Sequence, residues 1–309
     1  MQQAIIDSHA HVFKRNLPLA SVRRYAPDYD ATLTEYLELL DRHHICHGVL
    51  VQPSFLGTNN DYMLQALQES AGRCVGVAVV SPDCSIEELL ALRDSNVRGI
   101  RLNLFGTEGI DLQQDTWQQL FFRLKALDMH VELHAPMASL ADHIPPIIAH
   151  DVDLVVDHFG RPALRKPVSQ ARAAQESGVQ TGGIQTDGLR QAVLQEDAQH
   201  DTLFDADQFD FLFSLRNSDH LFIKLSAIYR LFDNVQTDKV KALLARFLDT
   251  FSSKKLMWGS DWPHTQFESS SNFNDSLAWA LQYIDQPVDR QNIFYNTAAS
   301  FYKIQGDKV

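Results

Sequence analysis

The sequence has few cysteines and no recognisable export segment. Its three cysteines, Cys46, Cys74 and Cys84, are odd in number and lie in or beside apolar runs, which is not the pattern of a disulfide framework. A chain of 309 residues buries enough apolar surface to fold without disulfides. We therefore expect reduced thiols and a cytoplasmic protein. Residues 1–7 contain no basic stretch followed by an apolar segment, so no signal peptide is expected.

Positive charge is also scarce. The chain has 27 Lys and Arg against 39 Asp and Glu, a net charge of −12, and no Lys/Arg cluster. This balance argues against nucleic acid or an anionic membrane as a partner. The longest apolar runs, such as residues 75–80, are far shorter than the ~18 residues of a membrane-spanning helix. A small molecule is the expected partner, and the sequence does not indicate an oligomeric state.

Short β-rich apolar runs alternate with longer helical stretches along the whole chain. The runs are residues 5–11, 47–54, 74–82, 97–106, 130–136, 154–162, 221–230 and 255–264. Each has the length and the Val, Ile and Leu content of a strand buried on both faces, which is typical of parallel sheets. Amphipathic segments lie between the runs. They follow the potential N-caps Thr32 or Thr34, Ser85, and Asp115 or Thr116, and they recur at 235–250, 271–284 and 289–301.

Eight consecutive strand–helix units predict an α/β protein, a (β/α)₈ TIM barrel that forms a single domain over residues 1–309. A doubly wound open sheet is the alternative, but no glycine-rich phosphate loop follows the first strand. The connection between strands six and seven is the longest. We expect an insertion at 163–220, with helices near 189–199 and 208–217, that covers the catalytic end of the barrel. A surface insertion without function is the alternative.

Polar side chains gather where the predicted strands end, which is where barrels carry their catalytic groups. The first strand ends in Asp7-Ser-His9-Ala-His11, and alternate residues of a strand face the same way. Asp7, His9 and His11 are therefore predicted to point together into the mouth. His134, His158 and Asp261 end strands five, six and eight. A packed core does not require this set, whereas imidazoles and a carboxylate suit zinc.

These strand-end positions resemble the metal and catalytic positions of the amidohydrolase superfamily, and the resemblance covers nearly the whole chain. The surrounding segments resemble its lactonase branch, that of the 2-pyrone-4,6-dicarboxylate lactonases. They are VQPSFLGTNNDYMLQAL (51–67), GIRLNL (99–104), VVDHFGRP (155–162) and MWGSDWPH (257–264), with a tail at 293–302 that follows the wider family. The resemblance implies a hydrolase of carboxylic ester bonds on a TIM barrel.

The resemblance also implies roles for the strand-end residues. It gives Asp261 the role of general base, assisted by His158, His9 and His11. One divalent ion, with zinc preferred, would bind to His9, His11, His134 and Asp261. A metal-free mechanism stays open, because the pyrone lactonases are understood to work without metal and to lack a histidine on strand five. A binuclear site is not expected, since strand four offers Arg101 and Asn103 where binuclear relatives carry a bridging Lys or Glu.

Arginines near the strand ends suggest a pocket for an acidic substrate. Arg101, Arg161 and Arg230 lie at or just beyond strands four, six and seven, and guanidinium groups bind carboxylates in a bidentate manner. The further predicted substrate contacts are Ser54, Tyr229 and His264. The alternative is that each arginine pairs with a nearby acid such as Asp157, Asp7 or Glu132. The resemblance also implies a further substrate-binding arginine just after strand four, and this arginine is absent, because residues 105–109 read FGTEG.

The sequence therefore predicts an enzyme that opens a small carboxylated lactone. The substrate is expected to be like 2-pyrone-4,6-dicarboxylate, a muconolactone or a sugar-acid lactone. Two alternatives use the same residues, namely a zinc-dependent decarboxylase of an aromatic or muconate-type acid and a lactone isomerase. A non-catalytic binding protein is disfavoured, because it would be expected to have lost at least one of the strand-end histidines or the aspartate.

Overall fold

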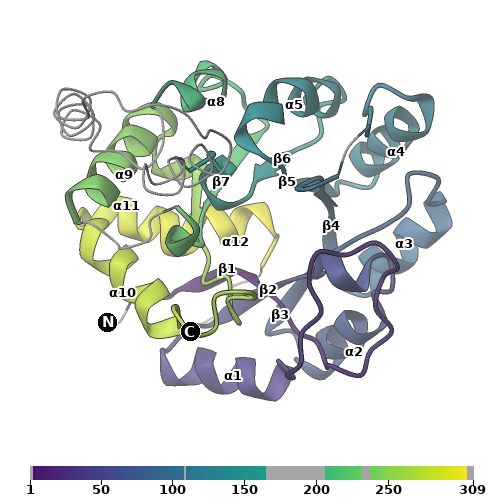
Figure 1. Cartoon of the computed structure of the whole chain (residues 1–309), viewed down its shortest axis with the longest axis horizontal. Helices are drawn as coiled ribbons and strands as arrows, with labels where there is room; N and C mark the ends of the chain where they lie inside the picture. The colour runs from purple at the N-terminus through teal and green to yellow at the C-terminus, as the bar shows by residue number, and fades with distance from the viewer. Residues whose placement is uncertain (1–2, 108, 165–205, 232–236, 305–309) are drawn as a thin grey trace, which may run out of the picture.

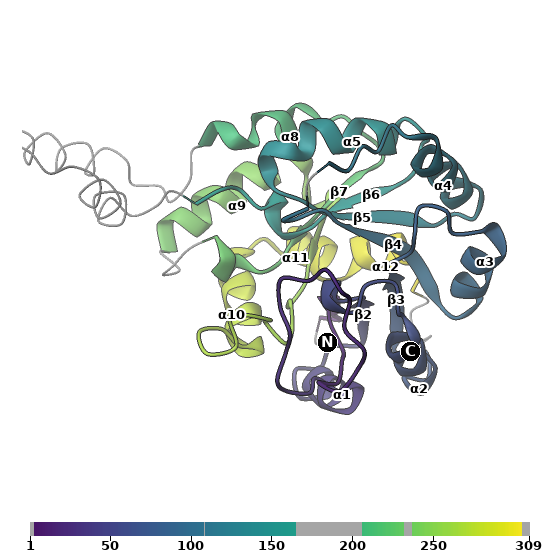
Figure 2. The ribbon, with the colours of Figure 1, turned by 45° about the vertical axis from the view of Figure 1, so that its right-hand side comes forward.

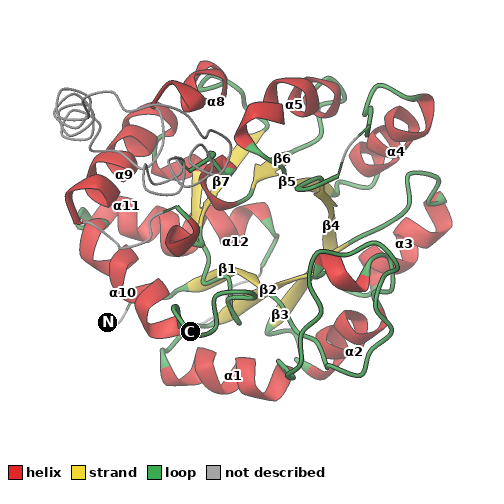
Figure 3. Ribbon diagram, in the orientation of Figure 1, coloured by secondary structure: helices red, strands yellow, loops and turns green. Residues whose placement is uncertain are grey.

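The computed structural model describes residues 3–107, 109–164, 206–231 and 237–304. Its centre is a ring of eight parallel strands in chain order (Figures 1 and 3). The strands are β1 (Ile6–Ala10), β2 (His47–Val51), β3 (Cys74–Ala78), β4 (Val97–Asn103), β5 (His130–His134), β6 (Leu154–Val156), β7 (Leu221–Leu225) and β8 (Leu256–Trp258). Beyond β8, a parallel bridge between Ala10 and Trp262 closes the ring. The predicted TIM barrel is confirmed.

Helices surround the strands on the outside of the ring (Figures 2 and 3). The α-helices of the described residues are α1 (Leu33–Arg42), α2 (Asp61–Glu69), α3 (Ile86–Asp94), α4 (Asp115–Ala126), α5 (Leu140–Ile148), α8 (Asp210–Ser214), α9 (Thr237–Phe251), α10 (Phe273–Tyr283), α11 (Pro287–Gln291) and α12 (Thr297–Phe301). Capping boxes at Thr32 and Ser85 start α1 and α3, in agreement with two predicted caps. The predicted cap of α4 was wrong, since Gln114 holds that position and Asp115 lies in the first turn.

The inside of the barrel is a packed apolar core. It contains Ile6, Val49, Val51, Val75, Val77, Val155, Met257 and Tyr302. A second, larger apolar cluster fills the space between the strands and the outer helices. These side chains pack below the mouth of the barrel. They lie beside buried polar groups of β5 and β7, since the hydroxyl of Tyr302 donates to Oε1 of Glu132 at 2.7 Å.

The long connection after β6 is only partly described. Its last part forms a short 3-10 helix (Ala206–Phe209) that leads into α8, close to the helix predicted near 208–217. The helix predicted at 189–199 lies outside the described residues. That the 163–220 insertion covers the catalytic end, and that residues 1–309 form one domain, remain predictions. No helix in the described ranges is long and apolar enough to cross a bilayer, and the three cysteines are free thiols.

Candidate active site at the carboxyl ends of the strands

A pocket of about 200 Å³ opens at the mouth of the barrel. The predicted residues that line it are Ser54, Arg101, His11, His134, His158, Arg161, Arg230 and Asp261. Residues that were not predicted also line it, among them Arg24, Tyr25, Asn103, Phe105 and Phe267. His9, Tyr229 and His264 are not part of the lining. The pocket thus brings together side chains that are separated by more than two hundred positions in the sequence.

His9 and His11 meet at the end of β1. Their Nε2 atoms are 3.3 Å apart, and both side chains are buried. Nδ1 of His11 lies 2.7 Å from the carbonyl oxygen of Val51 and therefore carries a proton that it donates there. Consequently Nε2 of His11 has a free lone pair on the side of the pocket.

Asp7 does not join these histidines, so that part of the sequence interpretation was wrong. The register of β1 against β2 shifts between Asp7 and Ala10, and this irregularity breaks the simple alternation of side chains. The carboxylate of Asp7 instead accepts hydrogen bonds from the Tyr36 hydroxyl at 2.9 Å and from the Ser260 hydroxyl at 2.6 Å. Asp7 therefore links β1 to α1 and to the segment after β8. It helps to hold these strand ends in place without lining the pocket.

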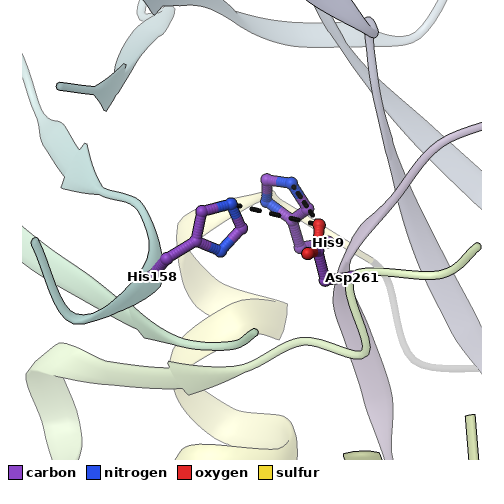
Figure 4. A group of neighbouring side chains, drawn as sticks. All are labelled: His9, His158 and Asp261. Carbon is purple, nitrogen blue, oxygen red and sulfur yellow. Dashed lines mark ion pairs between the residues drawn. The ribbon is translucent and has the colours of Figure 1, made fainter. Parts of the chain in front are cut away.

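One oxygen of Asp261 faces three histidines. Asp261 follows β8 in a left-handed backbone conformation, and its N–H donates to the His9 carbonyl oxygen at 2.8 Å. Its Oδ1 atom lies 3.6 Å from Nε2 of His9, 3.6 Å from Nε2 of His11 and 3.9 Å from Nε2 of His158. Figure 4 shows His9 and His158 converging on this carboxylate. Oδ1 is therefore the oxygen available to a water or a metal ion.

The other oxygen of Asp261 is already engaged. Oδ2 accepts a hydrogen bond from Nε of Arg230 at 3.1 Å and another from the hydroxyl of Tyr229. Burial alone would raise the pKa of the Asp261 carboxyl, but the Arg230 guanidinium holds that pKa well below its ordinary value. Asp261 is thus ionised at neutral pH and fixed in orientation. Tyr229 thus contacts this carboxylate through a hydrogen bond to Oδ2 and does not line the pocket.

His264 also lies behind Asp261. Its side chain is buried, its Nε2 is 3.1 Å from the hydroxyl of Ser276 on α10, and its ring packs edge-on against Tyr229. In this structure it supports Tyr229 and does not reach the pocket.

His158 and His134 are neutral imidazoles on the opposite side of the mouth. Burial lowers the pKa of each well below its ordinary value, and for His134 nearby Arg101 adds to this effect. Nδ1 of His158 lies 2.8 Å from the Ser226 hydroxyl, which directs Nε2 toward Asp261. The His134 ring stacks on Phe105, and neither of its nitrogens has a hydrogen-bond partner among the described residues. His134 therefore offers an unused donor and acceptor to whatever fills the pocket.

The three predicted arginines differ in how they are paired. Arg101 donates from Nε and Nη2 to Oδ2 of Asp157, at 3.1 and 2.9 Å. For this residue the structure therefore shows the predicted alternative, in which the arginine pairs with a nearby acid. Arg230 is paired with Asp261. Arg161 forms no ion pair within the described part of the chain and lies over the ring of Phe105, 4.6 Å from its centroid. Burial and the neighbouring Arg230 lower the pKa of Arg161 to about 10.

A buried charged network beneath the pocket was missed by the sequence analysis. Nζ of Lys224 lies 2.6 Å from Oε1 of Glu132, 3.2 Å from Nδ1 of His9 and 3.9 Å from Oδ1 of Asp157. All four side chains are buried. The signal was present in the sequence, because Lys224 stands in the apolar strand LFIKL and Glu132 lies between two apolar residues of HVELH, and a buried charge needs a partner.

The histidine–carboxylate cluster has a spacing that suits one metal ion. His9, His158 and Asp261 offer ligand atoms within 4.8 Å of one another, and His9, Glu132 and Asp157 form a second such group. Ligands of a tetrahedral zinc, with bonds of about 2.0–2.1 Å, stand about 3.4 Å apart. The Nε2 atoms of His9 and His11 and Oδ1 of Asp261 are 3.3–3.6 Å apart. The buried residues here could therefore hold a metal, although two of the four predicted ligands, His11 and His134, belong to neither of these groups.

Known proteins resemble this chain both in sequence and in structure. The chain is 28% identical over 273 residues to a 2-pyrone-4,6-dicarboxylate hydrolase of Comamonas testosteroni, covering 84% of this chain and 76% of that protein. It is 26% identical over 265 residues to a 4-sulfomuconolactone hydrolase of Rhizobium radiobacter, with the same coverage. A crystal structure of a probable 2-pyrone-4,6-dicarboxylic acid hydrolase from Acinetobacter baumannii, with citric acid bound, superposes with a TM-score of 0.81 at 32% identity, covering 97% of this chain and 99% of that one. The family model described as Amidohydrolase matches residues 6–304, and the chain belongs to this family.

Proposed function

We propose that the protein is a hydrolase that opens a small carboxylated lactone. The observation that carries this proposal is the position of Asp261. Its Oδ1 atom faces a pocket lined by arginines and by the neutral imidazoles of His134 and His158, while its Oδ2 atom is held by Arg230. The relatives named as hydrolases of pyrone dicarboxylate and sulfomuconolactone support the reaction class. The citric acid in the Acinetobacter structure supports a small polycarboxylate as the type of ligand.

In the proposed reaction, Asp261 acts as general base. Oδ1 takes a proton from a water molecule, and the resulting hydroxide attacks the lactone carbonyl carbon. The negative charge that develops on the carbonyl oxygen is stabilised by hydrogen-bond donors of the mouth, with Nε2 of His158 closest to Asp261 on the far side. The ring C–O bond then breaks, and Asp261 or His158 returns the proton to the leaving oxygen. The product is the ring-opened hydroxy acid or its keto tautomer.

The site also fits one divalent metal ion, and we assign it to His9, His11 and Asp261, with His134 as the further predicted ligand. When bound, zinc would polarise the lactone carbonyl and lower the pKa of the attacking water. His11 is suited to such a role, because its Nδ1 proton is fixed on the Val51 carbonyl and its Nε2 lone pair is free. His9 is suited to it when Nδ1 donates to Asp157, 3.4 Å away.

The arginines are proposed to bind the carboxylate of the lactone. Arg101 and Arg230 each use Nε and Nη2 on protein oxygens, which leaves Nη1 of each for a substrate. The Ser54 hydroxyl lines the same pocket and adds a donor. Binding there would hold the ester carbonyl near Oδ1 of Asp261.

Acid release from a panel of lactones, followed with a pH indicator, tests the proposal. The panel contains 2-pyrone-4,6-dicarboxylate, muconolactones and sugar-acid lactones, each with and without added zinc. We expect turnover only with carboxylated or sulfonated lactones. Folded protein that hydrolyses none of them would overturn the proposal. Release of carbon dioxide from an aromatic or muconate-type acid would then identify a decarboxylase, and a rearranged lactone without acid release would identify an isomerase.

A further inference from the structure

A chain of hydrogen bonds leads from the buried Lys224 of β7 to the histidine pair at the mouth of the barrel. Nζ of Lys224 lies 3.2 Å from Nδ1 of His9, and both side chains are buried. Because an ammonium group has no lone pair, Lys224 donates in this contact and Nδ1 of His9 accepts. Burial lowers the pKa of His9 to about 4, so its ring is neutral at pH 7. The single proton of this ring is then on Nε2.

His11 forms the next step of the chain and requires the same direction. Its Nδ1 donates to the carbonyl oxygen of Val51 at 2.7 Å, so the Nε2 of the neutral ring carries a lone pair. Nε2 of His9 is 3.3 Å from this nitrogen. With a proton on Nε2 of His9 this contact is a hydrogen bond, whereas without that proton two lone pairs would face each other. The Val51 carbonyl therefore selects the same tautomer of His9 as Lys224 does.

Asp157 is the competing partner of His9, and it is not part of this chain. Its Oδ1 atom is 3.4 Å from Nδ1 of His9 but has no hydrogen-bond partner among the described residues. Its Oδ2 atom accepts both hydrogen bonds of Arg101. A proton on Nδ1 of His9 would face the ammonium of Lys224 as one donor against another. The contacts of Nδ1 therefore favour the acceptor role.

The direction of the chain bears on metal binding. An imidazole nitrogen binds a metal ion through its lone pair. Nε2 of His9 lies 3.6 Å from Oδ1 of Asp261 (Figure 4), so it is the nitrogen that would ligate a metal held by this carboxylate. When Nε2 carries the proton, it has no lone pair to offer. Binding of zinc then requires that Nε2 loses its proton and that Nδ1 gains one, against the ammonium of Lys224.

We propose that Lys224 is a positioning residue that fixes the proton of His9 on Nε2 and thereby weakens metal binding at the mouth of the barrel. His9 is then a hydrogen-bond donor between His11 and Asp261. The zinc site assigned above fills only at higher zinc concentrations than its ligands would otherwise require. This inference does not depend on lactone hydrolysis, because a ring tautomer and a metal affinity are properties of the protein without substrate.

The tautomer of His9 can be measured in the intact protein. A long-range proton–nitrogen correlation spectrum of chelator-treated protein with isotope-labelled histidine distinguishes protonated from unprotonated ring nitrogens. The signals of His9 are those that the His9→Asn variant lacks. In the wild type we expect a proton on Nε2 and none on Nδ1. A wild-type His9 with its proton on Nδ1 would overturn the proposal.

Zinc affinity tests the role of Lys224. The variant Lys224→Met/Glu132→Gln removes the ammonium together with the charge of its carboxylate partner, which lies 2.6 Å away. Relative to Glu132→Gln alone, we expect the double variant to bind zinc about tenfold to a hundredfold more tightly, as measured by competition with a chromophoric chelator. Its His9 should carry the proton on Nδ1, donated to Asp157. The exposed Lys241→Met on α9 is the matched control and should bind zinc as the wild type does.

Two results in the double variant would contradict the proposal. Unchanged or weaker zinc binding would mean that Lys224 does not oppose the metal. Tighter zinc binding with an unchanged tautomer of His9 would mean that Lys224 acts by its charge alone. Thermal unfolding verifies that each variant is folded, and the wild-type spectrum decides the tautomer if the double variant is not. Neither measurement uses a substrate, so a failure of the proposed function leaves both results interpretable.

Discussion

Nζ of Lys224 lies 3.2 Å from Nδ1 of His9, and both side chains are fully buried beneath the pocket. An ammonium group can only donate, so this contact favours the His9 tautomer that carries its proton on Nε2. Oδ1 of Asp157, 3.4 Å from the same Nδ1, favours the opposite tautomer. Lys224 and Asp157 therefore compete to decide whether Nε2 of His9 donates a hydrogen bond or ligates a metal. Burial and Lys224 also lower the pKa of His9 to about 4, which keeps the ring neutral.

Replacing Lys224 by Met should destabilise the protein strongly. The variant leaves the carboxylates of Glu132 and Asp157 without their buried ammonium partner, and breaking such a pair costs about 3–5 kcal/mol. Urea unfolding measures this change, with the exposed Lys241→Met on α9 as a matched control expected to change stability by less than about 0.5 kcal/mol. The double variant Lys224→Met/Glu132→Gln should lose less than the sum of the single variants. Additive losses would contradict a direct interaction.

The ion pair of Lys224 and Glu132 also predicts that the stability of the protein depends on pH. Burial opposes the ionisation of Glu132, but Lys224 outweighs it and brings the pKa of Glu132 to about 2, below its ordinary 4.5. A carboxyl with a lowered folded-state pKa stabilises the protein above its unfolded pKa and loses that contribution as the pH falls toward the folded pKa. The difference in unfolding free energy between the wild type and Glu132→Gln should therefore shrink from pH 4.5 toward pH 2. Urea titrations over that range that show a constant difference would contradict this.

The regular part of the fold could be predicted from the sequence, and its irregular ends could not. All eight strands begin within a residue of where the apolar runs predict, because burial on both faces leaves a clear apolar signal. The predicted strands are too long, since β6 ends at Val156 and β8 at Trp258. The polar segments that follow leave the sheet through left-handed backbone positions at His158 and Asp261, and no periodicity marks these turns.

The site residues that directly follow strands could be predicted from the sequence. The residues that loops bring to the pocket, and the ion pairs within it, could not. His11, His134, His158 and Asp261 line the pocket because strand ends necessarily converge in a barrel. Arg24 was missed because its loop has no periodic pattern that would place it. The pairing of Arg230 with Asp261 depends on the local geometry of two separate strand ends, which sequence spacing does not specify.

Removal of metal should abolish most of the activity if the histidine cluster holds zinc. Dialysis against a chelator, followed by elemental analysis, is expected to reduce the metal content from near one ion per chain and to reduce turnover in parallel. Added zinc should restore both. The His11→Asn variant should bind less metal, because it removes the Nε2 lone pair that His11 presents to Asp261. Full turnover in protein that elemental analysis finds free of metal would instead establish the metal-free mechanism.

Asp261→Asn should lower kcat by orders of magnitude, about 10²–10⁴-fold, and leave KM nearly unchanged. An amide has nearly the same shape as the carboxylate and can still accept a hydrogen bond from Arg230, but it cannot take a proton from water. Tyr229→Phe is the matched comparison, because it removes a hydrogen bond to Oδ2 and leaves Oδ1 intact. Its kcat should fall much less, and its pH profile should shift because the carboxylate loses a donor. An Asp261→Asn enzyme with unchanged turnover would mean that Asp261 is not the base, and His158 would then be the residue to replace next.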